Sequence, residues 1–541
     1  MRAARGLLIV LLLLAGVPAA DAVARTTGSG SCGNRTTSAG DWPSLNHDLA
    51  NSRNQPDETS VGVPEAADLR PAWTFSGKAV GATGGMRSTP IVAGGCVYLG
   101  LGQGYLGDRG DVIALDEQTG AVVWHTTVDG SVLGLAAADG LIYATPSSGT
   151  RGDVALPVVT DTYAPAGSYA VALDARTGEV RWRSERLDDG NADNGTFVNA
   201  SPVVFEAGGR RMVFVPLAGG AGDGARIPMW FLDARTGATI AKAYSLTDAE
   251  YRAGFGGTGM WSTAAYDPAT QHLYVGTSDS DGRTRQHPYN NAILRIDANP
   301  QRPTFAKVVG AYSGTTEHAN LDSLIGYPHN PLCGTLAAEQ DLDLPTFFDT
   351  SASVECLELD FDFGASPNLY RSADGRLRVS ALQKSGVLHA VDAERMEPVW
   401  TAFLGPGGAF MDAGTASIAD GRIHVGATPN LLLGIDREAG DVRWLASTNS
   451  DLFAYQPVST ANGVLYTIND AGHLLAFDAA TGRQLLDRLI AADGRYEHCL
   501  GVGAGVAVSR GTVLVPCDAG GLADLAALPA PPGGLVAYRV P

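Results

Sequence analysis

The stretch that decides the fold is Ala114-Leu115-Asp116-Glu117-Gln118-Thr119-Gly120, which is followed four residues later by Trp124. It returns almost unchanged as Ala172-Leu173-Asp174-Ala175-Arg176-Thr177-Gly178 ahead of Trp182. Further copies keep apolar residues before an Asp, and several keep the Gly or the Trp. These copies end at Asp233, Asp297, Asp392, Asp436 and Asp478, with a weak last copy at Val536-Ala537-Tyr538-Arg539. An internal repeat of this length indicates the architecture before any single residue does.

Each copy predicts strands separated by tight turns. A β-rich run such as Cys96-Val97-Tyr98-Leu99-Gly100 comes first, a second strand ends at the Asp, and Thr-Gly turns into a third strand that carries the Trp. Alternating apolar residues broken by Gly and Asp indicate strands and not helices. The copies lie about 40 to 95 residues apart, which suits propeller blades with insertions. The sequence therefore predicts an all-β fold, an eight-bladed β-propeller of four-stranded antiparallel blades over residues 41–541. We expect the Trp of one blade to pack on the next.

Composition limits the class of partner. The chain has 57 Asp and Glu against 38 Lys and Arg, a formal net charge of −19. No basic stripe offsets this charge, which argues against nucleic-acid binding and favours a solvated acidic surface.

Residues 1–22 are predicted to be a signal peptide. Arg2 and Arg5 precede an apolar run from Leu7 to Leu14, and Ala20-Asp21-Ala22 offers a small-residue cleavage site. The run is too short for a comfortable membrane span. We therefore expect a secreted or periplasmic protein with no membrane span after cleavage, and a flexible linker over residues 23–40.

The six cysteines suggest disulfides, because their number is even and the chain is expected to be exported. Cys333–Cys356 and Cys499–Cys517 are the natural local pairs, which leaves Cys32–Cys96, although sequence alone does not fix the pairing. Cys-x-x-Cys does not occur in the sequence, which disfavours covalent haem and a zinc ribbon.

Two short motifs resemble ligand-binding loops but lack the neighbouring structure that such loops need. Gly102-Gln103-Gly104-Tyr105-Leu106-Gly107 matches the dinucleotide-binding glycine pattern, but residues 111–115 after it predict a strand where the motif needs a helix. Asp279-Ser280-Asp281-Gly282 resembles part of a calcium loop and lacks the rest of an EF-hand, so a turn is the simpler interpretation.

The longest interval between copies, from Asp297 to Asp392, is where we expect the chemistry. It contains Asp360-Phe361-Asp362-Phe363-Gly364 and then Gln383-Lys384-Ser385-Gly386. Two carboxylates two residues apart share one face of a strand, and in a loop they can converge on a cation, with a lysine as counter-ion. Spacing alone favours a simpler interpretation, a solvated acidic loop and a surface lysine.

Three features together resemble the quinoprotein alcohol dehydrogenases, most closely a branch similar to polyvinyl alcohol dehydrogenase. They are the opening Asp41-Trp42-Pro43-Ser44-Leu45-Asn46-His47, the Asp-x-x-Thr-Gly-x-x-x-Trp repeats and the Asp-Phe-Asp-Phe-Gly segment. The resemblance covers nearly all of the mature chain. It implies an eight-bladed propeller that holds pyrroloquinoline quinone and calcium on its axis. The implied substrate is a small-molecule or polymeric alcohol, and the implied partner is an electron-acceptor protein.

The same resemblance assigns roles to five residues. Asp360 falls where the family has its catalytic base, and Asp362 where some members have an additional metal-binding carboxylate. Asp279 falls at a metal-ligand position, so the implied metal ligands are Asp279, Asp360 and Asp362. Lys384 falls where a basic residue contacts the quinone. Trp261, in Met260-Trp261-Ser262, resembles the floor under the quinone ring, whereas the residue alone predicts a packed core aromatic.

Three departures from the family pattern keep a second hypothesis open. Residues 147–153 contain no Glu at the place of a metal ligand; Asp153 could substitute for it, but Arg151 there would oppose a cation. Residues 164–168 lack the adjacent cysteine pair, and residues 407–412 lack a family Trp. The chain is therefore either a quinone-dependent alcohol oxidoreductase or a non-catalytic propeller that has lost the cofactor and acts as a binding or assembly scaffold.

Overall fold

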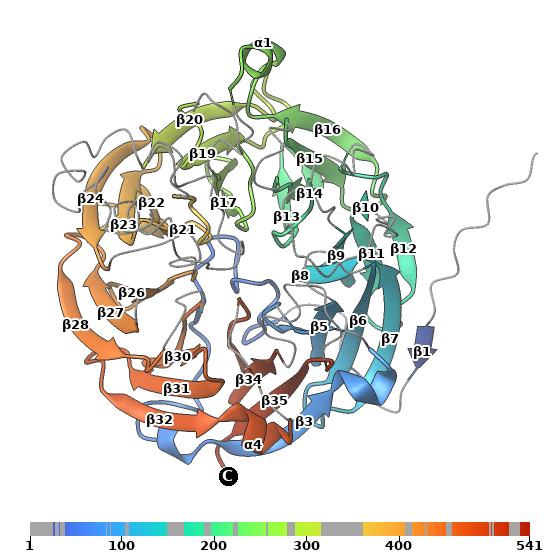
Figure 1. The fold of residues 1–541 in the computed structure, drawn as a ribbon, viewed down its shortest axis with the longest axis vertical. Coiled ribbons are helices and arrows are strands. Elements are labelled where there is room, and N and C mark those ends of the chain that lie inside the picture. The colour runs from blue at the N-terminus through green and yellow to red at the C-terminus, as the bar shows by residue number, and fades with distance from the viewer. Residues whose placement is uncertain are drawn as a thin grey trace, which may run out of the picture.

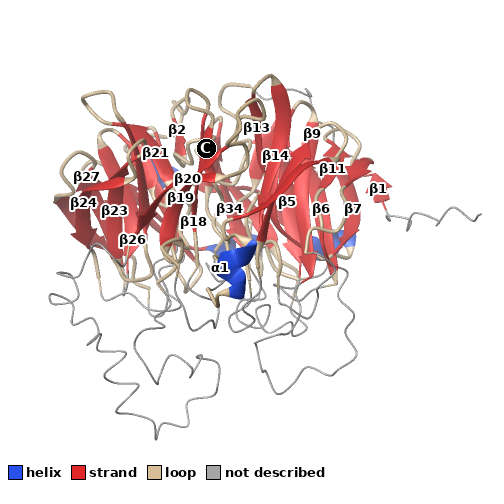
Figure 2. Cartoon of the chain, turned by 90° about the horizontal axis from the view of Figure 1, so that it is seen from above, coloured by secondary structure: helices blue, strands red, loops and turns tan. Residues whose placement is uncertain are grey.

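The computed structural model describes residues 25–27, 32, 38–82, 84–86, 88–102, 108–148, 167–188, 196–219, 226–255, 258–278, 287–314, 361–405, 414–427, 430–450, 457–496, 499, 503–518 and 531–541. The described strands form eight sheets that follow one another around a ring, and the four main strands of each sheet pair antiparallel (Figure 1). Figure 2 shows the ring from the side, with the strands running through its depth. The predicted eight-bladed propeller is therefore confirmed.

The first four blades follow the chain from the inner strand to the outer strand. Blade 1 is β4 (Ile91–Ala93), β5 (Cys96–Gly102), β6 (Arg109–Asp116) and β7 (Val122–Asp129), with β1 (Arg25–Thr27) on the outer edge of β7. Blade 2 is β8 (Ser131–Ala138), β9 (Leu141–Ser148), β10 (Gly167–Ser168), β11 (Val171–Asp174) and β12 (Val180–Arg183). Blade 3 is β13 (Val203–Ala207), β14 (Arg210–Pro216), β15 (Pro228–Asp233) and β16 (Thr239–Tyr244). Blade 4 is β17 (Ala265–Asp267), β18 (His272–Gly276), β19 (Ala292–Asp297) and β20 (Val308–Ser313).

The last four blades repeat this order. Blade 5 is β21 (Asn368–Arg371), β22 (Leu377–Leu382), β23 (Val387–Asp392) and β24 (Glu397–Phe403). Blade 6 is β25 (Ser417–Ala419), β26 (Arg422–Ala427), β27 (Leu431–Asp436) and β28 (Val442–Ser447). Blade 7 is β29 (Ser459–Ala461), β30 (Val464–Ile468), β31 (His473–Asp478) and β32 (Gln484–Leu489), with β2 (Asn54–Gln55) on its inner edge. Blade 8 is β33 (Ala507–Ser509), β34 (Thr512–Cys517), β35 (Gly534–Arg539) and β3 (Arg70–Ser76). The described helices are short: η1 (Ala66–Asp68), η2 (Gly77–Val80), α1 (Asp248–Arg252) and α4 (Ile490–Gly494).

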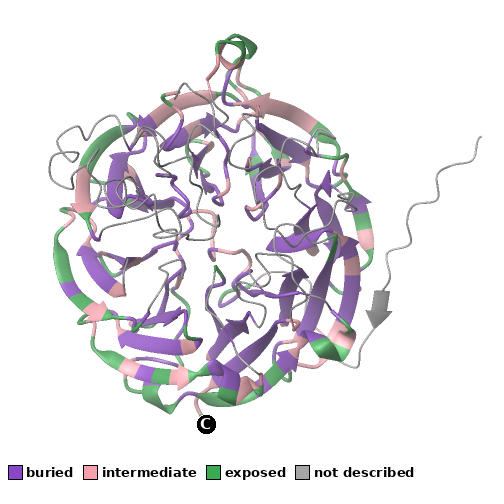
Figure 3. Cartoon of the chain, viewed as in Figure 1, coloured by how far each residue is buried: buried purple, intermediate pink, exposed green. Residues whose placement is uncertain are grey.

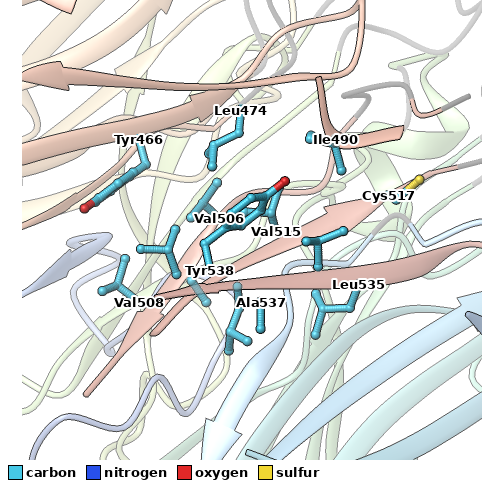
Figure 4. Close-up of a cluster of buried hydrophobic side chains, with 14 of the residues drawn as sticks. Tyr466, Leu474, Ile490, Val506, Val508, Val515, Cys517, Leu535, Ala537 and Tyr538 are labelled. Carbon is cyan, nitrogen blue, oxygen red and sulfur yellow. The ribbon is translucent and has the colours of Figure 1, made fainter. Parts of the chain in front are cut away.

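Blade 8 closes the ring with strands from both ends of the chain. Strand β3 pairs antiparallel with β35, with Ser76 opposite Gly534 and Arg70 opposite Arg539. Buried side chains of blades 7 and 8 pack around this junction, including Tyr466, Leu474 and Tyr538 (Figure 4). The closure removes the two open ends that a row of blades would otherwise expose. The inner strands are buried, and exposed positions gather on the outer strands (Figure 3).

The Asp and Gly of the repeat build the turn between the third and fourth strands. Asp116 Oδ1 accepts hydrogen bonds from the backbone N–H of Gln118 and Thr119 and from the Thr119 hydroxyl, at 3.1, 2.9 and 2.8 Å. Gly120 then takes a φ of 70°, which a residue with a side chain adopts only at a cost. The repeat Ala114–Gly120 therefore ends in a turn that is stabilised by its own Asp side chain.

The Trp of the repeat joins neighbouring blades. Trp124 is fully buried, and its Nε1–H donates to the carbonyl of Ala175, the residue after the Asp of blade 2, at 3.0 Å. A Cβ at Gly178 would lie 2.5 Å from the Trp124 ring, so only glycine allows this approach. The prediction that Trp packs on the next blade is confirmed. The same hydrogen bond and glycine contact recur for Trp73, Trp182, Trp400 and Trp444.

Two of the predicted disulfides are present. Cys32 is bonded to Cys96 and Cys499 to Cys517, with Cα atoms 5.3 and 5.0 Å apart. Cys333 and Cys356 lie outside the described residues, as does the predicted signal peptide. Among the helices that the structure describes, none is long and apolar enough to cross a membrane.

Candidate cofactor site

Hydroxyl side chains just before the inner strands form a partial belt, which links blades 3 to 6 and blade 8 to blade 1. In each case a backbone N–H donates to a Ser or Thr hydroxyl of another blade. Ser201 N bonds to Thr263 Oγ1 at 3.0 Å, Thr263 N to Ser366 Oγ at 3.2 Å, and Ser366 N to Thr415 Oγ1 at 3.1 Å. Gly505 N bonds to Thr89 Oγ1 at 3.1 Å in the same way across blades 8 and 1. The belt holds the segment after residue 260 beside the segment after residue 361.

The N-terminal segment at residues 41–55 runs around the axis and contacts the blades in chain order (blue trace at the centre of Figure 1). Its carbonyl oxygens accept hydrogen bonds of 2.6–2.9 Å from the inner strands of six blades. The donors are the backbone amides of Val92, Ala137, Tyr266, Leu369, Ile418 and Thr460. Arg53 in this segment is fully buried and donates to the carbonyls of Leu45, Val458 and Val506, and burial lowers the pKa of its guanidinium to about 9. The segment at residues 41–55 therefore joins six of the blades to one another at the axis.

Three of the five predicted site residues lie together beside the belt. Trp261 Nε1–H donates to Asp362 Oδ2 at 2.8 Å, and Lys384 Nζ donates to the same oxygen at 3.1 Å. Lys384 Nζ lies 5.0 Å from the centroid of the Trp261 ring, within the range of a cation–π interaction. The side chains of Lys384 and Asp362 are only 7% and 9% exposed. We call these three residues the axial cluster.

Two backbone features set the position of Lys384. It lies in the tight turn between β22 and β23, where Gly386 takes a φ of 80° and its N–H donates to Gln383 O at 2.9 Å. The Lys384 N–H also donates to the carbonyl of Asp362 at 3.0 Å. Lys384 and Asp362 are therefore held together through both main chain and side chain.

The other two predicted residues, Asp360 and Asp279, lie outside the described residues, and so do Arg151 and Asp153, where the sequence departs from the family pattern. Within the described part of the chain there is no group of three or more His, Cys, Asp or Glu side chains that could hold a metal ion. The described residues therefore do not by themselves supply a metal centre.

The axial cluster, whose Lys384 and Asp362 form an ion pair, offers more to a planar cofactor than to a bare cation. Trp261 is partly exposed, unlike the fully buried Trp124, so its ring has surface left for a ligand. Lys384 adds a positive charge beside this ring, and indole faces bind flat π systems. Asp362 Oδ2 already accepts two hydrogen bonds, which lowers its capacity to bind a metal ion through that oxygen.

The fold is an eight-bladed propeller of the kind found in quinoprotein alcohol dehydrogenase structures. A family model described as outer membrane protein assembly factor BamB matches residues 57–242 and 384–528. This is more than half of the chain, and the chain belongs to that family.

Individual relatives confirm the predicted branch. The chain is 26% identical over 444 residues to a polyvinylalcohol dehydrogenase of Sphingopyxis sp. (strain 113P3), covering 71% of this chain and 60% of that protein. It is 25% identical over 538 residues to a polyvinylalcohol dehydrogenase of a Pseudomonas species, covering 88% and 72%. The match thus spans less than two thirds of the first relative's length.

A europium-containing methanol dehydrogenase has the same fold with a TM-score of 0.67. It is 17% identical, and the superposition covers 93% of this chain and 98% of that chain. At this identity the similarity confirms the fold alone.

The family match covers the framework and leaves out most of the candidate site. The unmatched residues 243–383 contain Trp261, Asp279, Asp360 and Asp362, and Lys384 is the first residue of the second matched segment. Membership in the family therefore explains the propeller and does not by itself establish the chemistry at its axis.

Sequence analysis missed the hydroxyl belt and the role of Arg53. The signal for the belt is a Ser or Thr two residues before the first residue of an inner strand, with Pro or Ala between them. It occurs as Thr89-Pro90, Ser201-Pro202, Thr263-Ala264, Ser366-Pro367 and Thr415-Ala416. For Arg53 the sequence offers no comparable signal, because its acceptors are backbone carbonyls from remote segments.

Proposed function

We propose that the protein is an exported, quinone-dependent oxidoreductase that oxidises an alcohol by hydride transfer to pyrroloquinoline quinone. The observation that carries the proposal is the axial cluster, in which an indole, an ammonium group and a carboxylate meet at the inner ends of two blades. The named relatives are polyvinylalcohol dehydrogenases, which supports a small-molecule or polymeric alcohol as substrate.

Each residue would contribute a separate part of the reaction. When bound, pyrroloquinoline quinone supplies a two-electron acceptor for the hydride that the alcohol carbon loses. Trp261 would hold the flat face of the cofactor. Lys384 would stand beside a quinone oxygen and stabilise negative charge there. Asp360 is proposed to take the hydroxyl proton of the alcohol as the general base.

We keep calcium as part of the proposal, with Asp279, Asp360 and Asp362 as oxygen ligands. This part rests on the resemblance, because two of the three ligands lie outside the described residues and Asp362 is engaged by Trp261 and Lys384. The described residues therefore support the quinone more strongly than the metal ion.

Export and an acceptor protein are also proposed. The disulfides Cys32–Cys96 and Cys499–Cys517 suit an oxidising compartment outside the cytoplasm, and the predicted N-terminal signal peptide is consistent with export. Electrons from the reduced quinone would leave to an acceptor protein.

A second candidate function is a binding or assembly scaffold without a cofactor. It is favoured by the family model, whose description is an assembly factor and whose match omits residues 243–383. The missing Glu in residues 147–153 points the same way.

Reconstitution separates the two functions. Purified full chain is mixed with calcium and pyrroloquinoline quinone, and dye reduction is measured with a panel of alcohols that includes polyvinyl alcohol. The enzyme predicts bound quinone and alcohol-dependent dye reduction, whereas a chain that binds no quinone and reduces no dye is a scaffold.

The Asp360→Asn variant tests the base. It should bind quinone and melt as the wild type does while losing dye reduction. Activity retained in this variant would refute the role of Asp360. His424→Phe, a buried substitution in blade 6, serves as the matched control and should keep full activity.

A further inference from the structure

A second layer of buried polar residues lies behind the axial cluster. Tyr312, Gln383 and His389 are at most 2% exposed, and they come from the outer strand of blade 4 and from the β22–β23 hairpin of blade 5. None of the three has a role in the function proposed above. Buried polar side chains are costly unless they are paired, so their arrangement calls for an explanation.

His389 is bonded through both ring nitrogens. Its Nδ1 lies 3.0 Å from the Tyr312 hydroxyl oxygen, and its Nε2 lies 3.3 Å from Gln383 Oε1. With Gln383 Oε1 as the acceptor at Nε2, a neutral His389 carries its proton on Nε2 and accepts at Nδ1 from the Tyr312 hydroxyl. The ring is thereby fixed in one tautomer and one orientation.

His389 contacts both segments that supply the axial cluster. On one side, Gln383 is the residue directly before Lys384, and its Oε1 also accepts from the Ser385 hydroxyl at 2.6 Å, which ties the turn together. On the other side, the ring of Phe363, directly after Asp362, packs edge-on against His389 with centroids 5.1 Å apart and planes at 67°. A single imidazole therefore bridges the lysine turn and the carboxylate segment.

We infer that His389 is a positioning residue that sets the placement of Lys384 relative to Asp362 and Trp261. His389 acts on the axial cluster indirectly. It is hydrogen-bonded to Gln383, the neighbour of Lys384, and it packs against Phe363, the neighbour of Asp362. Its effect on turnover rests on the proposed function, whereas its effect on the geometry of the axial cluster does not.

The test uses ¹⁹F NMR of the full chain labelled with 5-fluorotryptophan, recorded without quinone. Trp261→Phe assigns the Trp261 resonance among the eight tryptophans. Lys384→Met then gives the position of that resonance when the contact between lysine and indole is lost. His389→Phe should move the Trp261 resonance toward the Lys384→Met position and leave the resonances of the framework tryptophans in place.

His424→Phe is the matched control. His424 is also fully buried, in the neighbouring blade 6, and stacks on Trp444 with centroids 5.7 Å apart. This control should move the Trp444 resonance and leave that of Trp261 unchanged. A folded His389→Phe variant with an unshifted Trp261 resonance would overturn the inference.

Tyr312→Phe covers the case in which His389→Phe does not fold. It deletes one hydroxyl and keeps the ring that packs on His389. A smaller shift of Trp261 in the same direction supports the inference, and no shift overturns it.

In reconstituted enzyme, His389→Phe should lower kcat by about 10- to 100-fold with KM nearly unchanged, as expected for a misplaced supporting group. An unchanged kcat in an active enzyme would contradict the positioning role in turnover. If the wild type is inactive, the proposed function fails, and the NMR result still decides the structural part.

Discussion

Trp124 and Trp261 use the same side chain for different purposes. Trp124 is fully buried, donates to a backbone carbonyl and lies against Gly178 of the next blade. Trp261 is partly exposed, donates to the carboxylate of Asp362 and has Lys384 over its ring. The first tryptophan belongs to a repeat that recurs around the ring, and the second stands outside it. The indole of the framework residue Trp124 is thus satisfied by backbone, whereas that of the candidate site residue Trp261 is satisfied by an ionisable side chain.

Trp124→Ala should have the largest effect of the substitutions considered. It leaves a cavity between blades 1 and 2 and removes a buried hydrogen bond, so we expect a loss of about 3–5 kcal/mol in the free energy of unfolding. Chemical denaturation followed by far-UV circular dichroism measures this loss. A loss below that of an ordinary surface substitution would show that the junction between blades does not depend on the indole.

Lys384→Met comes next, because it leaves the nearly buried Asp362 carboxylate without its cation. We expect a loss of about 2–3 kcal/mol, since removing the cation from a buried ion pair is costly. Asp362→Asn in the same chain should recover most of that loss. Denaturation of both single variants and the double variant gives the coupling energy. Additive effects in this cycle would mean that the pair observed at 3.1 Å contributes no interaction.

Trp261→Ala sharpens the comparison with Trp124→Ala because the substitution is identical. We expect a loss of only about 1 kcal/mol in stability, since the ring is partly exposed. The Kd for pyrroloquinoline quinone should rise at least about tenfold, because the stacking surface is gone. Equilibrium dialysis measures the Kd. If this variant loses as much stability as Trp124→Ala and binds quinone normally, Trp261 is a framework residue.

The contrast also explains how much the sequence could predict. The turn from Asp116 to Gly120 is built within one short segment, so its pattern is visible wherever it recurs. Thr263 and Ser366 are 103 residues apart and Trp261 and Asp362 are 101 residues apart, so their contacts leave no local pattern. Resemblance to a family brought Trp261, Asp362 and Lys384 together, whereas spacing alone favoured a core aromatic and a solvated loop. The placement of Asp279 and Asp360 stays a prediction.

His424→Phe should have the smallest effect at neutral pH and an effect of known sign in acid. Within the described part of the chain, neither ring nitrogen of His424 has a hydrogen-bond partner. Burial, with a smaller contribution from Arg422, lowers the pKa of His424 from 6.5 to about 3. Replacing an unpaired buried polar ring by an apolar ring of similar shape is nearly neutral or stabilising at pH 7.

The sign follows from proton binding. Between pH 6.5 and 3 the unfolded chain binds a proton at His424 and the folded chain does not, so the stability of the wild type falls as the pH falls through this window. Phenylalanine removes this dependence, and at pH 4 the variant should be more stable than the wild type by up to about 3 kcal/mol. Thermal unfolding at pH 7 and pH 4 measures the difference. Equal acid sensitivity of the two proteins would mean that the His424 imidazole takes up its proton in the folded protein as readily as in the unfolded chain. A buried histidine in this propeller would then not need hydrogen-bond partners such as those of His389.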